Sequence, residues 1–144
     1  MLLTKTVNSQ IHETLGRLKP ELGGILDSKN GVITTFYFDE NSQFSNNSYY
    51  PSVATLNHQI SEWSKSGILF CGVIHSHPRG DTKLSHDDIQ FARKIIERNI
   101  SRIDKVYFPI TTSTNDSDVF YIKTYVVDLN GIVEEETIIV DDNI

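Results

Sequence analysis

The chain has 144 residues, of which 38% are hydrophobic and 22% are charged, a balance that is ordinary for a soluble globular protein and argues against a disordered one. Its formal charge is -6, with 19 acidic and 13 basic residues, and its basic residues are scattered, so a nucleic-acid-binding surface is not expected. The length predicts one domain over residues 1–144.

Cysteine usage and hydropathy suggest where the protein works. The single Cys71 cannot form an internal disulfide, which fits a reducing compartment. Polar residues follow the segment Met1–Lys5, and no run is long and apolar enough for a signal peptide or a membrane span. We therefore expect a cytoplasmic protein without a membrane anchor.

The first forty residues predict a helix and then a β-hairpin. The apolar residues at helical spacing before Pro20 are Val7, Ile11, Leu15 and Leu18. Residues 21–26 predict a strand, and Gly31–Phe38 is its expected hairpin partner, with the turn at Ser28–Gly31. The polar segment Asp39–Tyr50 that follows predicts a loop.

A second helix and a buried strand come next. Ser52 is the expected N-cap of a helix that ends at Gly67, and the apolar face of this helix consists of Val53, Leu56, Ile60 and Trp63. Residues 68–74 are nearly all apolar, so they predict a buried strand that leads into His75.

The rest of the chain predicts one helix and a group of strands. A surface loop is expected over Pro78–Leu84, and Ser85 opens a helix with the apolar residues Ile89, Ala92, Ile95 and Ile96. Three further strands are predicted at Val106–Thr111, Val119–Val127 and Ile132–Val140, the last two joined around Asn130-Gly131. Helices that alternate with strands early, and strands that cluster late, predict a mixed α/β domain.

Two histidines and an aspartate have the spacing of metal ligands. His75 and His77 occupy alternate positions, so their side chains are expected on one face of the strand, and Asp88 can add a carboxylate from the next helix. Three protein ligands leave one position of a tetrahedral zinc ion open, which is typical of a catalytic site. The alternative is an ordinary hydrogen-bonded histidine pair, which is difficult to bury on one face without a cation.

Two other candidate residues have structural alternatives. Ser85 and Asp88 have the spacing of a capping box, and this role can coexist with a functional one at a helix start, where negative charge is stabilised. Glu21 is the candidate general base because it precedes Gly23-Gly24, which allow a close approach of neighbouring backbone. Its alternative is a solvated carboxylate at the end of a strand.

These segments resemble one protein family. The residues Gly72–Pro78, followed by Ser85 and Asp88, resemble the H-S/T-H-P-x6-S-x-x-D signature of the JAMM/MPN+ zinc metalloproteases of the compact prokaryotic type. The segment Pro20–Leu26 is similar to the E-x-G-G-x-L segment of that family. The resemblance implies an MPN/JAB fold, which is an α/β fold with a mixed β-sheet flanked by helices, similar to cytidine deaminase.

Carried over by position, the resemblance implies that His75, His77 and Asp88 bind one Zn²⁺ per chain. It implies that Glu21 takes a proton from the attacking water and passes it to the leaving amine, while Ser85 hydrogen-bonds the oxyanion. Family members of this type cleave the isopeptide or peptide bond after the C-terminal glycine of ubiquitin or a ubiquitin-like protein. The implied partners are such a protein or its conjugates, with associated E1-like activating and E2-like conjugating enzymes.

Other classes of protein remain as alternatives. A noncatalytic MPN scaffold would usually have lost ligands that this chain keeps. Residues 78–81 also resemble a run in the RadC branch, which is linked to DNA repair, although Glu21 and the acidic balance argue against that branch. A zinc nucleoside deaminase needs a P-C-x-x-C pair, which a single cysteine excludes. The aromatic residues of the 39–50 loop are equally candidates for substrate contacts or parts of a plain solvent loop.

Overall fold

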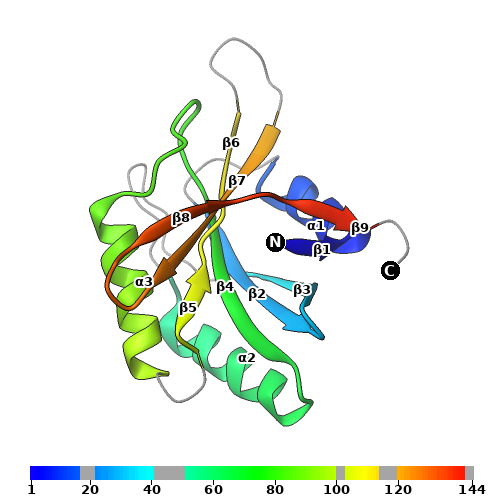
Figure 1. The fold of residues 1–144 in the computed structure, drawn as a ribbon. Helices are drawn as coiled ribbons and strands as arrows, with labels where there is room; N and C mark the ends of the chain where they lie inside the picture. Colours follow the sequence, from blue (N-terminus) through cyan, green and yellow to red (C-terminus); the bar gives the residue numbers. More distant parts are fainter. Residues whose placement is uncertain (17–21, 41–50, 100–102, 114–119, 142–144) are drawn as a thin grey trace.

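A computed structural model describes residues 1–16, 22–40, 51–99, 103–113 and 120–141 (Figure 1). Its elements in chain order are β1 (Leu2–Thr4), α1 (Lys5–Thr14), β2 (Gly23–Lys29), β3 (Val32–Phe38), α2 (Val53–Lys65), β4 (Leu69–Ser76), α3 (His86–Arg98), β5 (Lys105–Tyr107), β6 (Ile110–Ser113), β7 (Phe120–Asp128), β8 (Val133–Glu136) and β9 (Ile139–Asp141).

The described strands form one mixed sheet with helices on both faces (Figure 1). The strand order is β5-β7-β6-β4-β2-β3-β1-β9, and β8 pairs with the outer side of β7. The strand β4 is central, because it is antiparallel to β2 on one side and parallel to β6 on the other. The predicted fold class, a mixed β-sheet flanked by helices, is confirmed.

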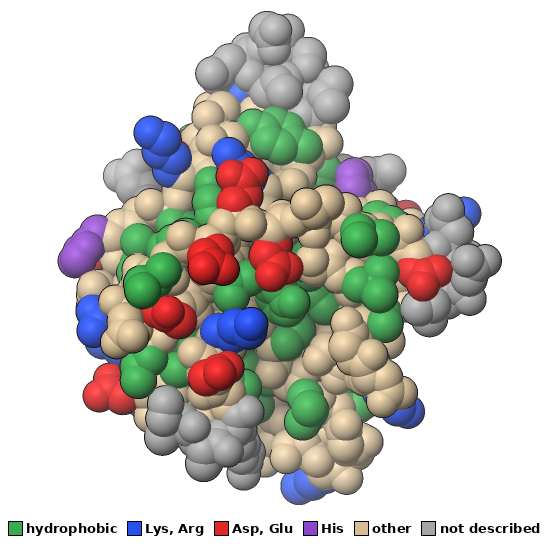
Figure 2. All heavy atoms as spheres, viewed as in Figure 1, with side chains coloured by type: hydrophobic (Ala, Val, Ile, Leu, Met, Phe, Trp, Pro, Cys, Tyr) green, Lys and Arg blue, Asp and Glu red, His purple; other side chains and the backbone are tan. Residues whose placement is uncertain are grey.

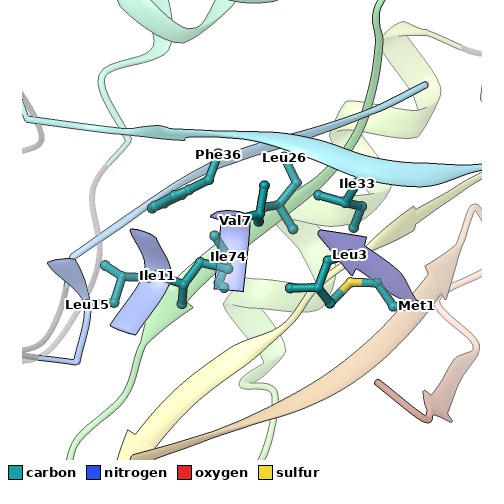
Figure 3. Close-up of a cluster of buried hydrophobic side chains, with 9 residues drawn as sticks. All are labelled: Met1, Leu3, Val7, Ile11, Leu15, Leu26, Ile33, Phe36 and Ile74. Atoms are coloured by element: carbon teal, nitrogen blue, oxygen red, sulfur yellow. The ribbon is translucent and has the colours of Figure 1, made fainter. Parts of the chain in front are cut away.

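The helix α1 covers one face of the sheet. It begins after Thr4, whose Oγ1 accepts a hydrogen bond from Val7 N at 3.1 Å, so one unpaired amide of the first turn is satisfied. The helix turns its apolar stripe toward the sheet (Figure 3), and the nine buried side chains of this core are Met1, Leu3, Val7, Ile11, Leu15, Leu26, Ile33, Phe36 and Ile74. The predicted helix is confirmed as far as Thr14, and Leu18 lies outside the described residues.

The helices α2 and α3 cover the opposite face (Figure 1). Leu56 and Trp63 from α2, with Ala92 and Ile96 from α3, are buried there. They pack against the sheet residues Ile25, Val73, Val106, Phe108 and Val127. This packing holds α3 against the same face of the sheet that carries His75.

The β-hairpin forms as predicted, but its first strand continues to Lys29, so the turn is shorter than the predicted Ser28–Gly31. Asn30 and Gly31 have φ values of 55° and 81°, which is the left-handed backbone that a tight two-residue turn requires. Gly24 is needed for the pairing of β2 with β3, because a Cβ atom there would lie 2.2 Å from the carbonyl oxygen of Tyr37. The close backbone approach expected at the glycine pair is therefore confirmed at Gly24.

Several predicted elements differ from those in the structure. The predicted strand Val106–Thr111 is divided into β5 and β6 around Pro109, which has no N–H to donate to a ladder. The predicted strand Ile132–Val140 is divided into β8 and β9, because β9 leaves β7 to pair in parallel with β1, a strand that was not predicted. Ser52 occupies the N-cap of α2 without a side-chain capping bond, and its backbone N–H instead donates to Asp39 Oδ2 at 2.8 Å.

Figure 2 shows acidic side chains spread over the face of the molecule that β8 crosses in Figure 1, with basic side chains between them. Glu134 and Glu135 of β8 are exposed, and Glu135 Oε2 lies 3.8 Å from Lys123 Nζ. Within the described ranges, the structure contains no helix long and apolar enough to cross a membrane.

Candidate metal centre

The end of β4 holds two histidines rigidly. His75 lies beside Gly23 of β2 and Ile110 of β6, so it is paired on both sides. His77 follows the last residue of the strand, and its backbone N–H donates to the carbonyl of Thr111 at 2.8 Å. Only 1% of His75 and 6% of His77 is exposed, so both imidazoles are fixed in a nearly dry environment.

Three ligand-type side chains converge at this point. The Nε2 atoms of His75 and His77 are 2.7 Å apart. Asp88 Oδ1 lies 3.2 Å from His75 Nε2, and Asp88 Oδ2 lies 3.4 Å from His77 Nε2. This group could hold a metal ion, since one ligand atom from each residue lies within 4.8 Å of the others. The convergence predicted for these three residues is therefore present.

The spacing of these atoms fits a small cation. A tetrahedral ion with bonds of about 2.0–2.1 Å holds its ligand atoms about 3.3 Å apart. The contacts of Asp88 with the two imidazoles are close to this value, at 3.2 Å through Oδ1 and 3.4 Å through Oδ2. The two imidazole nitrogens would separate by about 0.6 Å from their hydrogen-bonding distance of 2.7 Å to reach it. The donor set of two imidazoles and one carboxylate suits zinc and similar divalent metals.

Asp88 is positioned by the start of α3. Asp88 Oδ2 accepts a hydrogen bond from Ser85 N at 2.9 Å, and Ser85 Oγ accepts one from Asp88 N at 3.0 Å. This reciprocal pair is a capping box, as the sequence predicts. The same carboxylate oxygen caps the helix and faces His77, so the local helix signal also aims Asp88 at the histidines.

Protonation states at this centre suit metal binding. Burial acts to raise the pKa of Asp88, but hydrogen bonds from His75 and His77 outweigh it and hold that pKa well below its usual range. Burial lowers the pKa of His75, against the opposing influence of Asp88. A charged carboxylate beside a neutral imidazole is the protonation state in which both side chains can bind a cation.

Ser76, between the two histidines, anchors the chain next to Glu21. Ser76 N donates to the carbonyl of Leu22 at 2.8 Å, and Leu22 N donates to Ser76 Oγ at 3.1 Å. Leu22 is thus held against the strand that carries the ligands. Glu21 itself lies outside the described residues, and so do Phe44, Tyr49 and Tyr50 of the predicted substrate loop. Their proposed roles stay predictions.

Two neighbours of the histidines were not predicted. The ring of Phe108 lies edge-on to His75, with 5.2 Å between the ring centroids. Asp81 Oδ2 lies 3.3 Å from His77 Nδ1, the nitrogen on the opposite side of the ring from Asp88. The position of Asp81, four residues after His77, was available as a signal, whereas the approach of Phe108 depends on how the strands pair.

The arrangement of strands and helices is an MPN-like α/β fold, as comparison with solved structures indicates. AF2198 of Archaeoglobus fulgidus, a JAB1/MPN domain protein, has a TM-score of 0.54 and 16% identity, and the match covers 96% of each chain. Protein DSY2949 of Desulfitobacterium hafniense, known from a solution structure, has a TM-score of 0.74 and 20% identity over 98% of this chain and 92% of that one. No family model and no curated protein matches the sequence.

Proposed function

We propose that this chain is a zinc-dependent metallopeptidase of the JAMM type. It cleaves the isopeptide or peptide bond after the C-terminal glycine of ubiquitin or a ubiquitin-like protein, in a deubiquitinase-like deconjugation or processing reaction. The observation that carries the proposal is the convergence of His75, His77 and Asp88 at the end of β4, in a fold similar to that of a JAB1/MPN domain protein.

The residues have distinct roles in the proposed reaction. His75, His77 and Asp88 would hold the ion, which when bound acts as a Lewis acid and lowers the pKa of a coordinated water to about 7. Glu21 accepts a proton from the attacking water and delivers it to the leaving amine. Its neighbour Leu22 is hydrogen-bonded to Ser76, which lies between the two histidines in the sequence. This proximity supports the role of Glu21.

Ser85 is proposed to stabilise the oxyanion. Its hydroxyl oxygen accepts the amide proton of Asp88, and a hydroxyl that accepts one bond can still donate its own proton. Ser85 is exposed at the start of α3, where amide groups and the helix dipole favour negative charge. The cap and the catalytic role are therefore compatible in one side chain.

The proposed partner is a ubiquitin-like protein or its conjugate, with associated E1-like and E2-like enzymes. An extended C-terminal tail can be bound through main-chain hydrogen bonds, and a glycine end is narrow enough to reach a centre walled by buried histidines. The expected absence of nucleic-acid binding and the cytoplasmic location stay predictions.

Hydrolysis of ubiquitin and ubiquitin-like proteins that carry a fluorogenic amide on their C-terminal glycine tests the proposal. We expect turnover by the zinc-loaded chain and none after complete chelation. Glu21→Gln should lower turnover by about 100- to 10,000-fold and keep the metal, because it removes a base and no ligand. Glu62→Gln is the matched control, since Glu62 is an exposed carboxylate on α2 that pairs with Lys65 at 2.9 Å.

Each outcome separates the roles. Cleavage that survives complete metal removal would contradict a metallopeptidase. Loss of metal in Glu21→Gln would show that Glu21 is a ligand and not a base. A zinc-loaded chain that cleaves none of these proteins would favour the noncatalytic MPN scaffold.

A further inference from the structure

The loop after His77 is fixed to the neighbouring strand by several hydrogen bonds. Gly80 N donates to the carbonyl of Ser113 at 2.8 Å and to Thr112 Oγ1 at 3.1 Å. Thr112 Oγ1 in turn donates to the carbonyl of Pro78 at 2.8 Å. Gly80 has a φ of 80°, a backbone conformation that favours glycine. The chain therefore turns at a defined place directly after the second histidine.

This turn directs the two oxygens of Asp81 to different partners. Asp81 N donates to the carbonyl of Pro78 at 3.0 Å, which closes the turn. Asp81 Oδ1 accepts a hydrogen bond from Lys83 N at 3.2 Å. Asp81 Oδ2 lies 3.3 Å from His77 Nδ1. One oxygen thus stabilises the loop, and the other is available to the histidine.

The two nitrogens of His77 face different groups. Nε2 faces His75 Nε2 and the carboxylate of Asp88, so it is the nitrogen that would bind a cation. A metal-binding nitrogen must be unprotonated, which requires the ring proton to be on Nδ1. A carboxylate that accepts a hydrogen bond from Nδ1 would favour that tautomer and fix the plane of the ring, and Asp81 Oδ2 lies 3.3 Å from Nδ1.

Orientation, and not attraction, is the expected contribution of this contact. The Asp81 side chain is 49% exposed, so solvent weakens its electrostatic attraction to the imidazole. The loop bonds nevertheless hold the carboxylate at one place, while His77 is almost fully buried. An oriented acceptor at the mouth of a buried site can select a tautomer even where its net attraction is small.

We propose that Asp81 is a positioning residue for the metal centre, which accepts the Nδ1 proton of His77 and so presents Nε2 to the ion. This inference rests on the proposed metal site and adds a residue to it. If Asp81 only stabilised the loop, it would need only Oδ1, which accepts from Lys83 N. The positioning role also needs Oδ2, which faces His77, so a substitution that changes one oxygen can distinguish the two roles.

Asp81→Asn separates the two roles. Asparagine keeps a carbonyl oxygen that can accept from Lys83 N, but it replaces the acceptor facing His77 with an amide donor. The affinity for Zn²⁺ is measured by competition with a chromophoric chelator, and the ligand field is measured from the visible spectrum of Co²⁺-loaded protein. We expect affinity to fall about 10- to 100-fold and the Co²⁺ bands to shift.

Asp87→Asn is the matched control. Asp87 is an exposed aspartate in the first turn of α3, next to the ligand Asp88, so the variant makes the same charge change close to the site. Its affinity should stay within about twofold of the wild type, because exposed charges contribute little. Asp81→Glu keeps the carboxylate and should recover part of the affinity lost in Asp81→Asn.

The outcomes also distinguish this inference from the function on which it rests. Wild-type protein that binds neither Zn²⁺ nor Co²⁺ overturns the proposed metal site and the role of Asp81 together. Normal binding and an unchanged Co²⁺ spectrum in Asp81→Asn overturn the role of Asp81 alone. An affinity loss in Asp81→Glu that is absent in Asp81→Asn, with lower stability of the metal-free Asp81→Glu chain, would indicate a loop role and overturn it as well.

Discussion

Titratable groups lie at both ends of the β2–β4 pair, and the pKa values of the acidic groups shift in opposite directions at the two ends. At one end, His75 and Asp88 face each other, and the pKa of Asp88 lies well below its usual range. At the other end, Asp27 is buried and Cys71 is partly buried, and desolvation raises the pKa of both groups, that of Cys71 to about 12. Burial alone favours neutral groups, whereas the facing histidines keep the partly buried carboxylate of Asp88 in its charged form.

The two ends of the β2–β4 pair also differ in the residues that surround them. The far end borders a pocket of about 680 Å³, and its lining includes the apolar residues Ile60, Ile68, Leu69 and Phe70. Cys71 Sγ donates weakly there to the carbonyl of Leu26 at 3.6 Å. Over the described part of the chain, His75, His77 and Asp88 are the one group of three or more histidine, cysteine or acidic residues placed to hold an ion.

The largest effect is expected at Cys71. A pKa raised from 9.0 to about 12 lowers the thiolate fraction at pH 8 about 1000-fold, so the native thiol should react at least that much more slowly than an exposed one. The rate with a disulfide reagent, measured before and after unfolding in guanidinium, checks this. A fast native reaction would show that this end of the sheet is open to solvent.

Replacement of Asp88 or Asp27 by asparagine should affect metal binding differently. Asp88→Asn removes a ligand, so we expect Zn²⁺ affinity to fall by more than about 100-fold, beyond the usual loss for a residue outside the ligand set. Asp27→Asn should leave the affinity unchanged, because Asp27 interacts with Thr34 at 3.5 Å and not with the histidines. Elemental analysis and chelator competition measure both. Equal losses would contradict the assignment.

Acid should destabilise the metal-free protein. The folded-state pKa of His75 lies below the ordinary value of about 6.5 for a histidine, so the unfolded chain binds more protons near that pH and the free energy of unfolding falls as pH decreases. The slope is at most about 1.4 kcal/mol per pH unit for one proton. Urea unfolding from pH 7.5 to pH 5 measures it.

Asp27 provides an internal contrast to this prediction. Its pKa is raised, so its contribution to stability is present at low pH and is lost as pH rises through the folded-state pKa. Asp27→Asn should therefore steepen the loss of stability in acid, and His75→Gln should flatten it. A stability that is independent of pH in all three proteins would contradict both signs.

The smallest effect is expected at Ser85. Ser85→Ala removes the capping oxygen that accepts from Asp88 N, which costs about 1 kcal/mol of stability. It also removes the proposed donor to the oxyanion, so turnover should fall as well. Ser85→Thr keeps both groups and serves as the control. Reduced stability with unchanged turnover would leave only the capping role.

Local patterns determined much of the candidate site. The spacing of His75 and His77 places both rings together at the end of one strand, and Ser85 with Asp88 closes a capping box, because residues two or three apart interact through local backbone geometry. The apolar run before His75 likewise predicted the central strand β4. The role of Glu21 still depends on the family resemblance.

Only the tertiary structure decided which distant segments meet. The pairing of β9 with β1, the edge-on contact of Phe108 with His75 and the anchoring of Leu22 by Ser76 join residues far apart in the sequence. Such contacts depend on the competition among all strands for partners and buried area, which no local pattern records. The sequence by itself thus specified the candidate ligands and their helix and strand, while the packing of the whole sheet specified their surroundings.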